Sequence, residues 1–461
     1  MRLHQHPNLN QLVADFEQAI LEGNTFYLDD NARQDLIHYY DCTRQYDWAL
    51  EVLDFSIALQ PFTVELLVQK ANYLNDLQKY SLALQTVEQA LNFSPKHYEL
   101  LLLRVEILGA LGNTDEAFVE LDNLEEAPRP SLHADYLVTS AILSEQVMAF
   151  EKAYYLLKAA LEIVPDHTQA LERLGIIVEI TKKYADSISF HQGILDKAPY
   201  TYQAWFNLGQ AFVFSGRYQE AIEAYEYAFI IDPYFEIAIR EYLDLCFELR
   251  LYDKVLHCYE DLKQNFILDT EDWLRIGQCY LDKTCYKESN QALQQALLVD
   301  PFNDEVYFYL GELMAEQEHW QSAISYYDKA ISIEHTREEY YASRGETFFH
   351  LDRFFEAELD FKKAVDLAPE DGRYTIQYCS FLMQMQRSVE ALYLLDEVAE
   401  QGDPELMYGR IACLFMLGRR KEGIYRLGEA LIEDFEAHSI LFELIPDLAG
   451  DRDVSSMIAG Y

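Results

Sequence analysis

Pairs of side chains one helical turn apart are the positions in this sequence best suited to hold a metal ion. Glu312 and Glu316 are four residues apart, and Glu346 and His350 repeat that spacing. Residues at i and i+4 lie on one side of a helix, so each pair could supply two ligands. No compact cluster of His and Cys accompanies them, and solvated charged helix faces explain both pairs more simply. We therefore predict no metal and no other cofactor.

Catalytic chemistry has no recognisable motif in this sequence. It contains no P-loop and no GxGxxG, GxSxG, HExxH or DxDxDG pattern. The seven cysteines include no CxxC pair, and an odd number of thiols in a chain of 461 residues argues against a disulfide framework. Reduced thiols are typical of cytosolic proteins. These features predict a cytoplasmic protein that is not an enzyme.

The charge balance restricts the class of partner. The sequence has 79 acidic and 36 basic residues, which gives a formal net charge of −43. Such a field repels nucleic-acid phosphate and anionic lipid and attracts basic partners. A simpler explanation is that the acidity keeps a long chain soluble and monomeric. No stretch approaches 18 apolar residues and the N-terminus lacks an apolar signal segment, so we expect no membrane-spanning segment. Together with the repulsive charge, this predicts that neither a membrane nor a nucleic acid is the partner.

Prolines mark a fixed period along the chain. Seven of the 12 prolines are separated by 34 residues or multiples of 34, apart from one two-residue slip: Pro61, Pro95, Pro165, Pro199, Pro233, Pro301 and Pro369. A period of this length indicates stacked helical repeats, in which each unit buries its apolar face against its neighbours. The fold class predicted from this period is an all-α solenoid of helix–turn–helix repeats.

Residues 202–235 show the repeat most clearly. A stripe at i, i+3, i+4 and i+7 predicts a first helix, and its members are Trp205, Leu208, Gly209 and Phe212. Gly216 ends that helix, and Pro233 closes the unit after a second helical stripe. In the preceding unit His191 replaces the usual aromatic residue of the second helix. We expect His191 to be partly buried with its polar atoms satisfied.

This pattern resembles the tetratricopeptide repeat, in which a large residue, Leu-Gly, Tyr, Ala, Phe, Ala and Pro stand at set offsets. We predict about 12 units, beginning near residues 30, 64, 98, 134, 168, 202, 236, 270, 304, 338, 372 and 404. The resemblance implies a right-handed superhelical α-solenoid. A capping helix is expected in residues 1–29, the tandem units in 30–436 with bends near 125–133 and 401–405, and a capping segment in 437–461. The last segment is similar to the ends of stand-alone bacterial tetratricopeptide-repeat proteins.

In tetratricopeptide-repeat proteins the first helix of each hairpin lines a concave groove, and the resemblance implies the same for this chain. At the groove offsets acidic residues far outnumber the two basic ones, Arg240 and Arg373, and aromatic residues lie among them. Fixed acids on a concave wall attract cations, and aromatic rings anchor Lys and Arg. The predicted partner-binding residues are Glu172, Glu179, Phe206, Gln210, Phe214, Arg240, Asp244, Glu248, Asp282, Glu305, Phe308, Glu312, Glu316, Glu346 and Phe349. The alternative is that acids are common on any exposed helix of so acidic a protein.

The function predicted from these features is a non-catalytic scaffold for protein–protein interaction. It would bind a basic peptide or protein in an acidic, aromatic-lined groove, with Glu312, Glu316 and Glu346 exposed there. One alternative is a regulator that senses a peptide and changes its superhelical pitch. Another is an assembly factor that self-associates through exposed edges.

Overall fold

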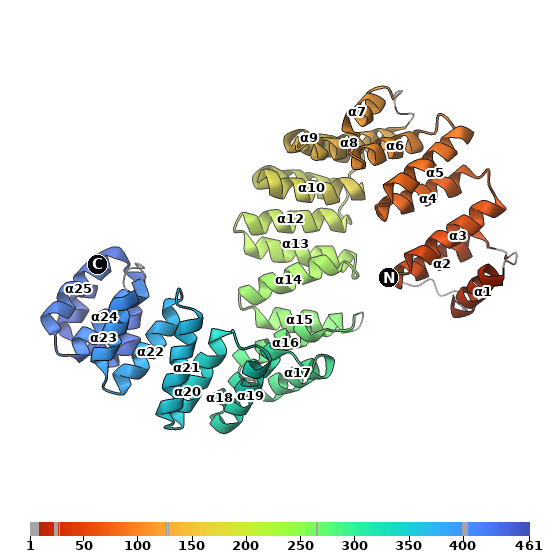
Figure 1. Ribbon diagram of the computed structural model, residues 1–461. Helices are drawn as coiled ribbons and strands as arrows, with labels where there is room; N and C mark the ends of the chain where they lie inside the picture. The colour runs from red at the N-terminus through yellow and green to blue at the C-terminus, as the bar shows by residue number, and fades with distance from the viewer. Residues whose placement is uncertain are drawn as a thin grey trace. The chain divides into compact units, whose positions relative to one another are not determined.

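The structure is a computed structural model that describes residues 9–22, 26, 28–124, 127, 129–263, 266–398 and 404–461. All regular secondary structure in these ranges is helical, which confirms the all-α fold class. The chain divides into two compact units, residues 1–248 and 249–461. Each unit is a stack of antiparallel helical hairpins (Figure 1).

Unit 1 contains α1 and six complete hairpins, followed by α14. Its helices are α1 (Leu9–Glu22), α2 (Asp30–Cys42), α3 (Tyr46–Leu59), α4 (Val64–Asp76), α5 (Tyr80–Phe93), α6 (Tyr98–Ala110), α7 (Thr114–Asp122), α8 (Pro130–Gln146), α9 (Phe150–Ile163), α10 (Thr168–Thr181), α11 (Tyr184–Lys197), α12 (Tyr202–Phe214), α13 (Tyr218–Ile231) and α14 (Glu236–Glu248). The even-numbered helices from α2 to α14 are first helices, and the odd-numbered helices from α3 to α13 are second helices.

Unit 2 starts with the second helix α15 and continues with five complete hairpins. Its helices are α15 (Tyr252–Leu262), α16 (Thr270–Asp282), α17 (Tyr286–Val299), α18 (Asp304–Glu316), α19 (Trp320–Ile333), α20 (Glu338–His350), α21 (Phe354–Leu367), α22 (Gly372–Gln384), α23 (Ser388–Val398), α24 (Pro404–Met416), α25 (Arg420–Glu433), η2 (Glu436–His438), α26 (Ser439–Leu444), η3 (Pro446–Gly450) and α27 (Arg452–Ile458).

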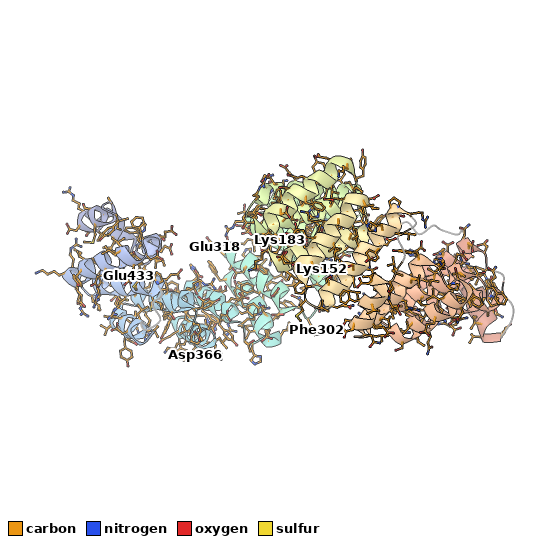
Figure 2. The ribbon with its side chains drawn as sticks, turned by 90° about the horizontal axis from the view of Figure 1, so that it is seen from above. Lys152, Lys183, Phe302, Glu318, Asp366 and Glu433 are labelled. Atoms are coloured by element: carbon orange, nitrogen blue, oxygen red, sulfur yellow. The ribbon has the colours of Figure 1, made fainter. Side chains whose placement is uncertain are left out.

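The turn after each first helix contains one residue in the left-handed region. These residues have φ between 56° and 86° and are Arg44, Gln78, Gly112, Met148, Lys182, Gly216, Arg250, Thr284, Glu318, Asp352, Gln386 and Gly418. They recur every 34 residues, with one interval of 36 residues after Gly112 and one of 32 before Gly418. Glu318 is labelled in Figure 2. A left-handed residue lets the next amide bond back to the last helical turn, as the Arg217 amide does to the Phe212 carbonyl at 2.9 Å.

Small residues allow the two helices of a hairpin to approach closely. Gly209 of α12 faces the ring of Tyr225 in α13, and Gly311 of α18 faces Tyr327 in α19. Tyr225 and Tyr327 are among the largest fully buried side chains of the protein. A buried tyrosine supplies a large apolar area, so these two hairpins bury much of their core beside a glycine.

The end segments pack on their neighbours. In unit 1, α1 buries Phe16 in a cluster with Leu36 and Leu53 of the first hairpin. In unit 2, Leu441 and Val454 join the core cluster of the last hairpin. The Arg420 guanidinium bonds both carboxylate oxygens of Asp451 at 2.7 and 2.8 Å, which ties α25 to the start of α27.

Parts of the predicted layout lie outside the described residues. They are residues 1–8, 23–25 and 27 of the predicted N-terminal cap, residues 125, 126 and 128 of the first predicted bend, and residues 401–403 of the second. The boundaries of the caps and bends stay a prediction.

Candidate functional site

Three carboxylates gather on the first helices α18 and α20 of unit 2. Glu312 accepts a hydrogen bond from the Tyr327 hydroxyl at 2.6 Å. Burial raises the pKa of Glu312, and the neighbouring carboxylates of Glu346 and Glu316 raise it further. Glu316 and Glu346 are exposed, and neither forms an ion pair within the part of the chain that the structure describes. A protonated amine or guanidinium placed here would relieve the mutual repulsion of these groups.

The structure corrects the expected exposure of Glu312. Its side chain is largely buried against α19, where the hydroxyl of the core residue Tyr327 donates a hydrogen bond to the Glu312 carboxylate. Glu312 therefore contributes to the hairpin as well as to the local charge. Glu316 and Glu346 remain the accessible members of the cluster.

The other predicted residues of unit 2 lie on the first helices α16, α18 and α20. Glu305 is half-buried and pairs with Arg337 at 2.7 Å. Phe308 stacks on Tyr340 with ring centroids 4.9 Å apart. Phe349 is half-buried with its ring edge-on to Phe381. Asp282 is exposed at the end of α16. These two phenylalanines thus present only part of their rings to a partner.

In unit 1 the structure brings three predicted residues together around one small pocket. Glu179 of α10 and Gln210 and Phe214 of α12 line it with Asn207 and Tyr184. Phe214 is 51% exposed and stacks on Tyr184 with ring centroids 4.8 Å apart. The pocket therefore combines a carboxylate, an amide and an open aromatic face on the first-helix side of unit 1. In each unit we call the side with the predicted groove residues the first-helix face: in unit 1 it carries Glu179, Gln210 and Phe214, and in unit 2 it carries Glu312, Glu316 and Glu346.

Glu241 belongs to the first-helix face although its offset does not predict it. Burial raises the pKa of Glu241, and the nearby carboxylates of Asp244 and Glu179 add to that effect. The acids of α10 and α14 are therefore close enough to interact. Asp244, Glu248 and Glu172 are exposed, as predicted from their offsets. The signal that was available for Glu241 is its position one residue after a groove offset.

Two predicted residues of unit 1 have other contacts. Phe206 is only 7% exposed, which is a correction, because its ring packs against Tyr225 and Phe235 with centroids 5.7 and 5.2 Å apart. It fills the space between α12 and the next turn and is not open to a partner. Arg240 pairs with Glu236 of its own helix at 2.9 Å, so its charge is locally neutralised.

Arg173 is a basic residue of the first helices that the sequence reasoning missed. Arg173 of α10 pairs with Glu145 of α8 at 2.8 Å. Burial raises the pKa of Glu106 in α6, while the nearby Arg173 guanidinium opposes that shift. The first helices α6, α8 and α10 therefore share a mixed, internally compensated polar cluster. The acidic first-helix face is the part from Glu179 onward in unit 1 and the Glu312 cluster in unit 2.

His191 is fully buried in α11. Its Nδ1 lies 2.9 Å from the Ser187 carbonyl, and Asn207 Nδ2 lies 3.3 Å from its Nε2. These contacts fit the neutral tautomer, in which Nδ1–H donates and Nε2 accepts. Burial lowers the pKa of His191 to about 4. The imidazole is a satisfied core group, as predicted, although it is more deeply buried than expected.

Family models for the tetratricopeptide repeat match residues 202–235 and 274–340. The chain is a tetratricopeptide-repeat protein. A model for the Chs5p-Arf1p-binding proteins also matches this tetratricopeptide-repeat protein, over residues 43–141.

Two curated proteins resemble parts of this tetratricopeptide-repeat protein. BBSome complex member BBS4 of Xenopus tropicalis is 24% identical over 148 residues, which are 29% of this chain and 28% of that protein. The UDP-N-acetylglucosamine–peptide N-acetylglucosaminyltransferase of Giardia intestinalis is 30% identical over 112 residues, which are 23% of this chain and 7% of the enzyme. The matches thus cover less than a third of either relative's length.

Solved structures of similar chains show low overall superposition. The Cut9–Hcn1 hetero-tetramer of the APC/C matches 94% of this chain and 96% of its own at 14% identity and a TM-score of 0.36. Yeast Tom70 matches 85% of this chain and 96% of its own at 14% identity and a TM-score of 0.39. MamA matches 36% of this chain and 98% of its own at 21% identity and a TM-score of 0.33.

The described residues contain neither a membrane-spanning helix nor a metal-binding cluster. No helix there is both long and apolar enough to cross a bilayer. No group of three or more His, Cys, Asp or Glu side chains in those ranges is arranged to hold a metal ion.

Proposed function

We propose that the first-helix face of this tetratricopeptide-repeat scaffold binds a basic peptide or protein segment. The repeats themselves support a role in protein–protein interaction, because stacked hairpins present extended binding surfaces. The proposal adds the charge of the partner and the residues that receive it.

The proposal rests on Glu316 and Glu346, the exposed carboxylates beside Glu312, which form no ion pair within the described residues. Glu316 and Glu346 lie close enough to raise the pKa of Glu312, and no ion pair compensates either of them in the described ranges. Elsewhere on the first helices the chain supplies its own cation, as Arg173 does for Glu145. A cluster left uncompensated on an exposed surface favours an external cation.

Binding on this face would proceed in two steps. The net charge of −43 and the local acids attract a basic segment and speed its encounter with the surface. In unit 2, the exposed parts of the Phe308 and Phe349 rings then provide apolar and cation–π contacts. The same charge disfavours nucleic acid and anionic membranes as partners.

We further propose that the protein acts in the cytoplasm and without catalysis. Among the described residues, Cys279, Cys379 and Cys413 are buried cysteines outside any disulfide, which suits a reducing compartment. Burial raises the pKa of Cys279 to about 12, so this thiol is a poor nucleophile. The matched segment of the glycosyltransferase is 7% of that enzyme, which is too little to carry its activity to this chain.

A charge-swap experiment tests the proposed face. Partners captured from lysate on the purified protein are identified by mass spectrometry, and their affinities are measured at low and high salt. The double variant Glu316→Lys/Glu346→Lys should weaken a basic partner about ten-fold. The control Glu288→Lys/Glu370→Lys makes the same change in net charge at exposed positions on α17 and in the turn before α22, and it should leave affinity nearly unchanged. Partners that are acidic, or binding that ignores salt, would contradict the proposal.

An assembly role is the second candidate. One relative is a member of a named complex, and exposed apolar side chains such as Phe302 and Tyr200 lie in turns between hairpins. Light scattering of the purified protein distinguishes the candidates, because self-association raises the molar mass with concentration and a monomeric scaffold does not.

A further inference from the structure

A larger pocket opens on the opposite side of α12 from the first-helix face. Its volume is about 300 Å³, and residues of α11, α12 and α13 line it. The α12 residues that line this pocket are Trp205, Leu208 and Phe212. The α12 residues that line the small pocket on the first-helix face are Asn207, Gln210, Ala211 and Phe214. The two pockets share no residue, so a ligand in one does not occupy the other. We call the larger one the second-helix pocket.

Two stacked aromatic rings line the second-helix pocket. The rings of Trp205 and Tyr227 are 4.5 Å apart and inclined by 29°. The indole Nε1–H of Trp205 donates to the Pro199 carbonyl at 2.8 Å, which holds the ring in place. Tyr227 is 51% exposed, so the aromatic wall is accessible from solvent.

Carboxylates surround this aromatic wall. Asp196, Glu220 and Glu223 line the pocket, and all three are exposed. Arg217 donates to both carboxylate oxygens of Glu220 from its Nε and Nη2. Asp196 and Glu223 have no ion-pair partner among the residues that the structure describes. The pocket therefore joins two aromatic rings to two uncompensated negative charges.

Other repeats of this chain show what such an aromatic residue attracts. Tyr307 stands 102 residues after Trp205, which is three periods of 34, and Lys329 Nζ lies 5.2 Å from the centre of its ring. Trp273 stands 68 residues after Trp205, which is two periods, and Lys263 Nζ lies 5.1 Å from its ring. At both places the protein covers the aromatic face with its own ammonium group.

At Trp205 neither of these lysines has a counterpart. The position equivalent to Lys329 is Tyr227, and the position equivalent to Lys263 is Leu195. Both line the second-helix pocket. Glu223, in turn, corresponds to Ser325 in the repeat of Lys329. The Trp205–Tyr227 wall therefore has no lysine in place of Lys263 or Lys329, and it carries a carboxylate where the repeat of Lys329 has a serine. The guanidinium of Arg217 lies over the ring of Phe212, 4.4 Å from its centre, and pairs with Glu220.

We propose that the second-helix pocket binds the side chain of a lysine or arginine from a basic protein segment. The ammonium or guanidinium group would lie at the Trp205–Tyr227 wall and the carboxylates of Asp196 and Glu223, where Lys263 and Lys329 lie in their own repeats. A volume of about 300 Å³ is at the lower end for ligand pockets, which suits one long side chain. This site is separate from the first-helix face and does not depend on it.

The four tryptophans allow a direct test on the full chain. With ¹⁵N-labelled tryptophan, the indole N–H signal of Trp205 is assigned from its loss in Trp205→Phe. Octalysine is then titrated, with an octapeptide of acetylated lysine as the uncharged control. The Trp205 signal should shift saturably with octalysine alone. The Trp273 signal is an internal reference, because Lys263 already covers that ring.

Three variants distinguish this pocket from other sites. Asp196→Asn/Glu223→Gln alters only exposed side chains and should weaken the affinity for octalysine, measured from the shift of the Trp205 signal, about five-fold. Tyr227→Lys supplies an internal cation, as Lys329 does, and should abolish the response. Glu316→Lys/Glu346→Lys should leave it intact, so failure of the first-helix proposal and failure of this one are distinguishable. A Trp205 signal that does not move with octalysine, or that moves equally in Asp196→Asn/Glu223→Gln, would overturn the assignment.

Discussion

Gly311 lies so close to the ring of Tyr327 that a β-carbon at position 311 would stand 2.4 Å from Cε1 of that ring. The backbone of α18 and the aromatic ring of α19 therefore occupy adjoining space with no room for a methyl group. We predict that Gly311→Ala destabilises the protein by about 1–3 kcal/mol, because the buried Tyr327 must shift. Urea denaturation followed by circular dichroism measures the change.

Gly193 provides the matched control for Gly311. It is also inside a helix, but no atom lies within 4 Å of the β-carbon that alanine would add. Gly193→Ala should therefore stabilise by about 0.5–1 kcal/mol through helix propensity alone. Equal effects of the two substitutions would show that the close contact at Gly311 does not exist in solution.

The left-handed turn residues predict a pair of opposite effects. Glu318 has a φ of 59°, which costs an L-residue free energy, and Gly216 has a φ of 71° in the equivalent turn. Glu318→Gly should raise the unfolding free energy by about 0.5–1 kcal/mol, and Gly216→Ala should lower it by a similar amount. Denaturation midpoints measure both, and shifts of the same sign would contradict the conformation of these turns.

Burial of His191 predicts a dependence of stability on pH. Its pKa is lowered to about 4, against an ordinary value near 6.5, so between these values the unfolded chain binds more protons than the folded one. The stabilising effect is fully present above pH 6.5 and is lost as the pH falls toward 4. At pH 5 the loss should be about 2 kcal/mol.

The difference between the protein and its His191→Gln variant isolates this effect from the many carboxylates. Unfolding free energies of both are measured from pH 7.5 to 4.5. The difference in unfolding free energy between the two proteins should narrow as the pH falls, because only the parent has a buried imidazole that is destabilised by protonation. A gap that is constant with pH would mean that His191 is not held neutral in the folded protein.

A bidentate ion pair predicts a large cost of removing one partner. Arg344 bonds the buried carboxylate of Asp360 through Nε and Nη2 at 2.7 and 2.8 Å and reaches Asp328 at 2.6 Å. Arg344→Met should destabilise by about 3–5 kcal/mol, because it leaves Asp360 charged and unpaired inside the hairpin. Arg344→Met/Asp360→Leu should recover most of that loss, and a double variant no better than the single one would contradict this account.

Much of the fold is visible in the sequence because it depends on local features. The proline period and the stripe that includes Leu208 and Gly209 predict where the helices of a hairpin lie. The fold class is confirmed, and the tetratricopeptide family is recognisable from one well-formed unit. The left-handed turn residues, in contrast, carry little signal, because glycine occupies only three of the twelve positions.

The candidate site was less predictable, because exposure depends on neighbours that are distant in sequence. Phe206 and Phe214 are both expected at the groove, yet Phe235 of the following turn covers the first and leaves the second open. Arg173 compensates acids of an earlier hairpin, Glu145 among them, and its helical offset does not reveal this. The pocket at Trp205 likewise depends on side chains from three helices.

Within the hairpin stacks, each helix makes its main contacts with helices at most two places away along the chain. A stretching force applied to the two ends would therefore act on the hairpins in series, so that each hairpin can unfold separately. Each hairpin that gives way would release 34 residues, or roughly 110 Å of extended polypeptide. The force should therefore rise and fall repeatedly as the protein is extended, with one small step for each hairpin, and the hairpins should refold in the same increments when the tension is removed.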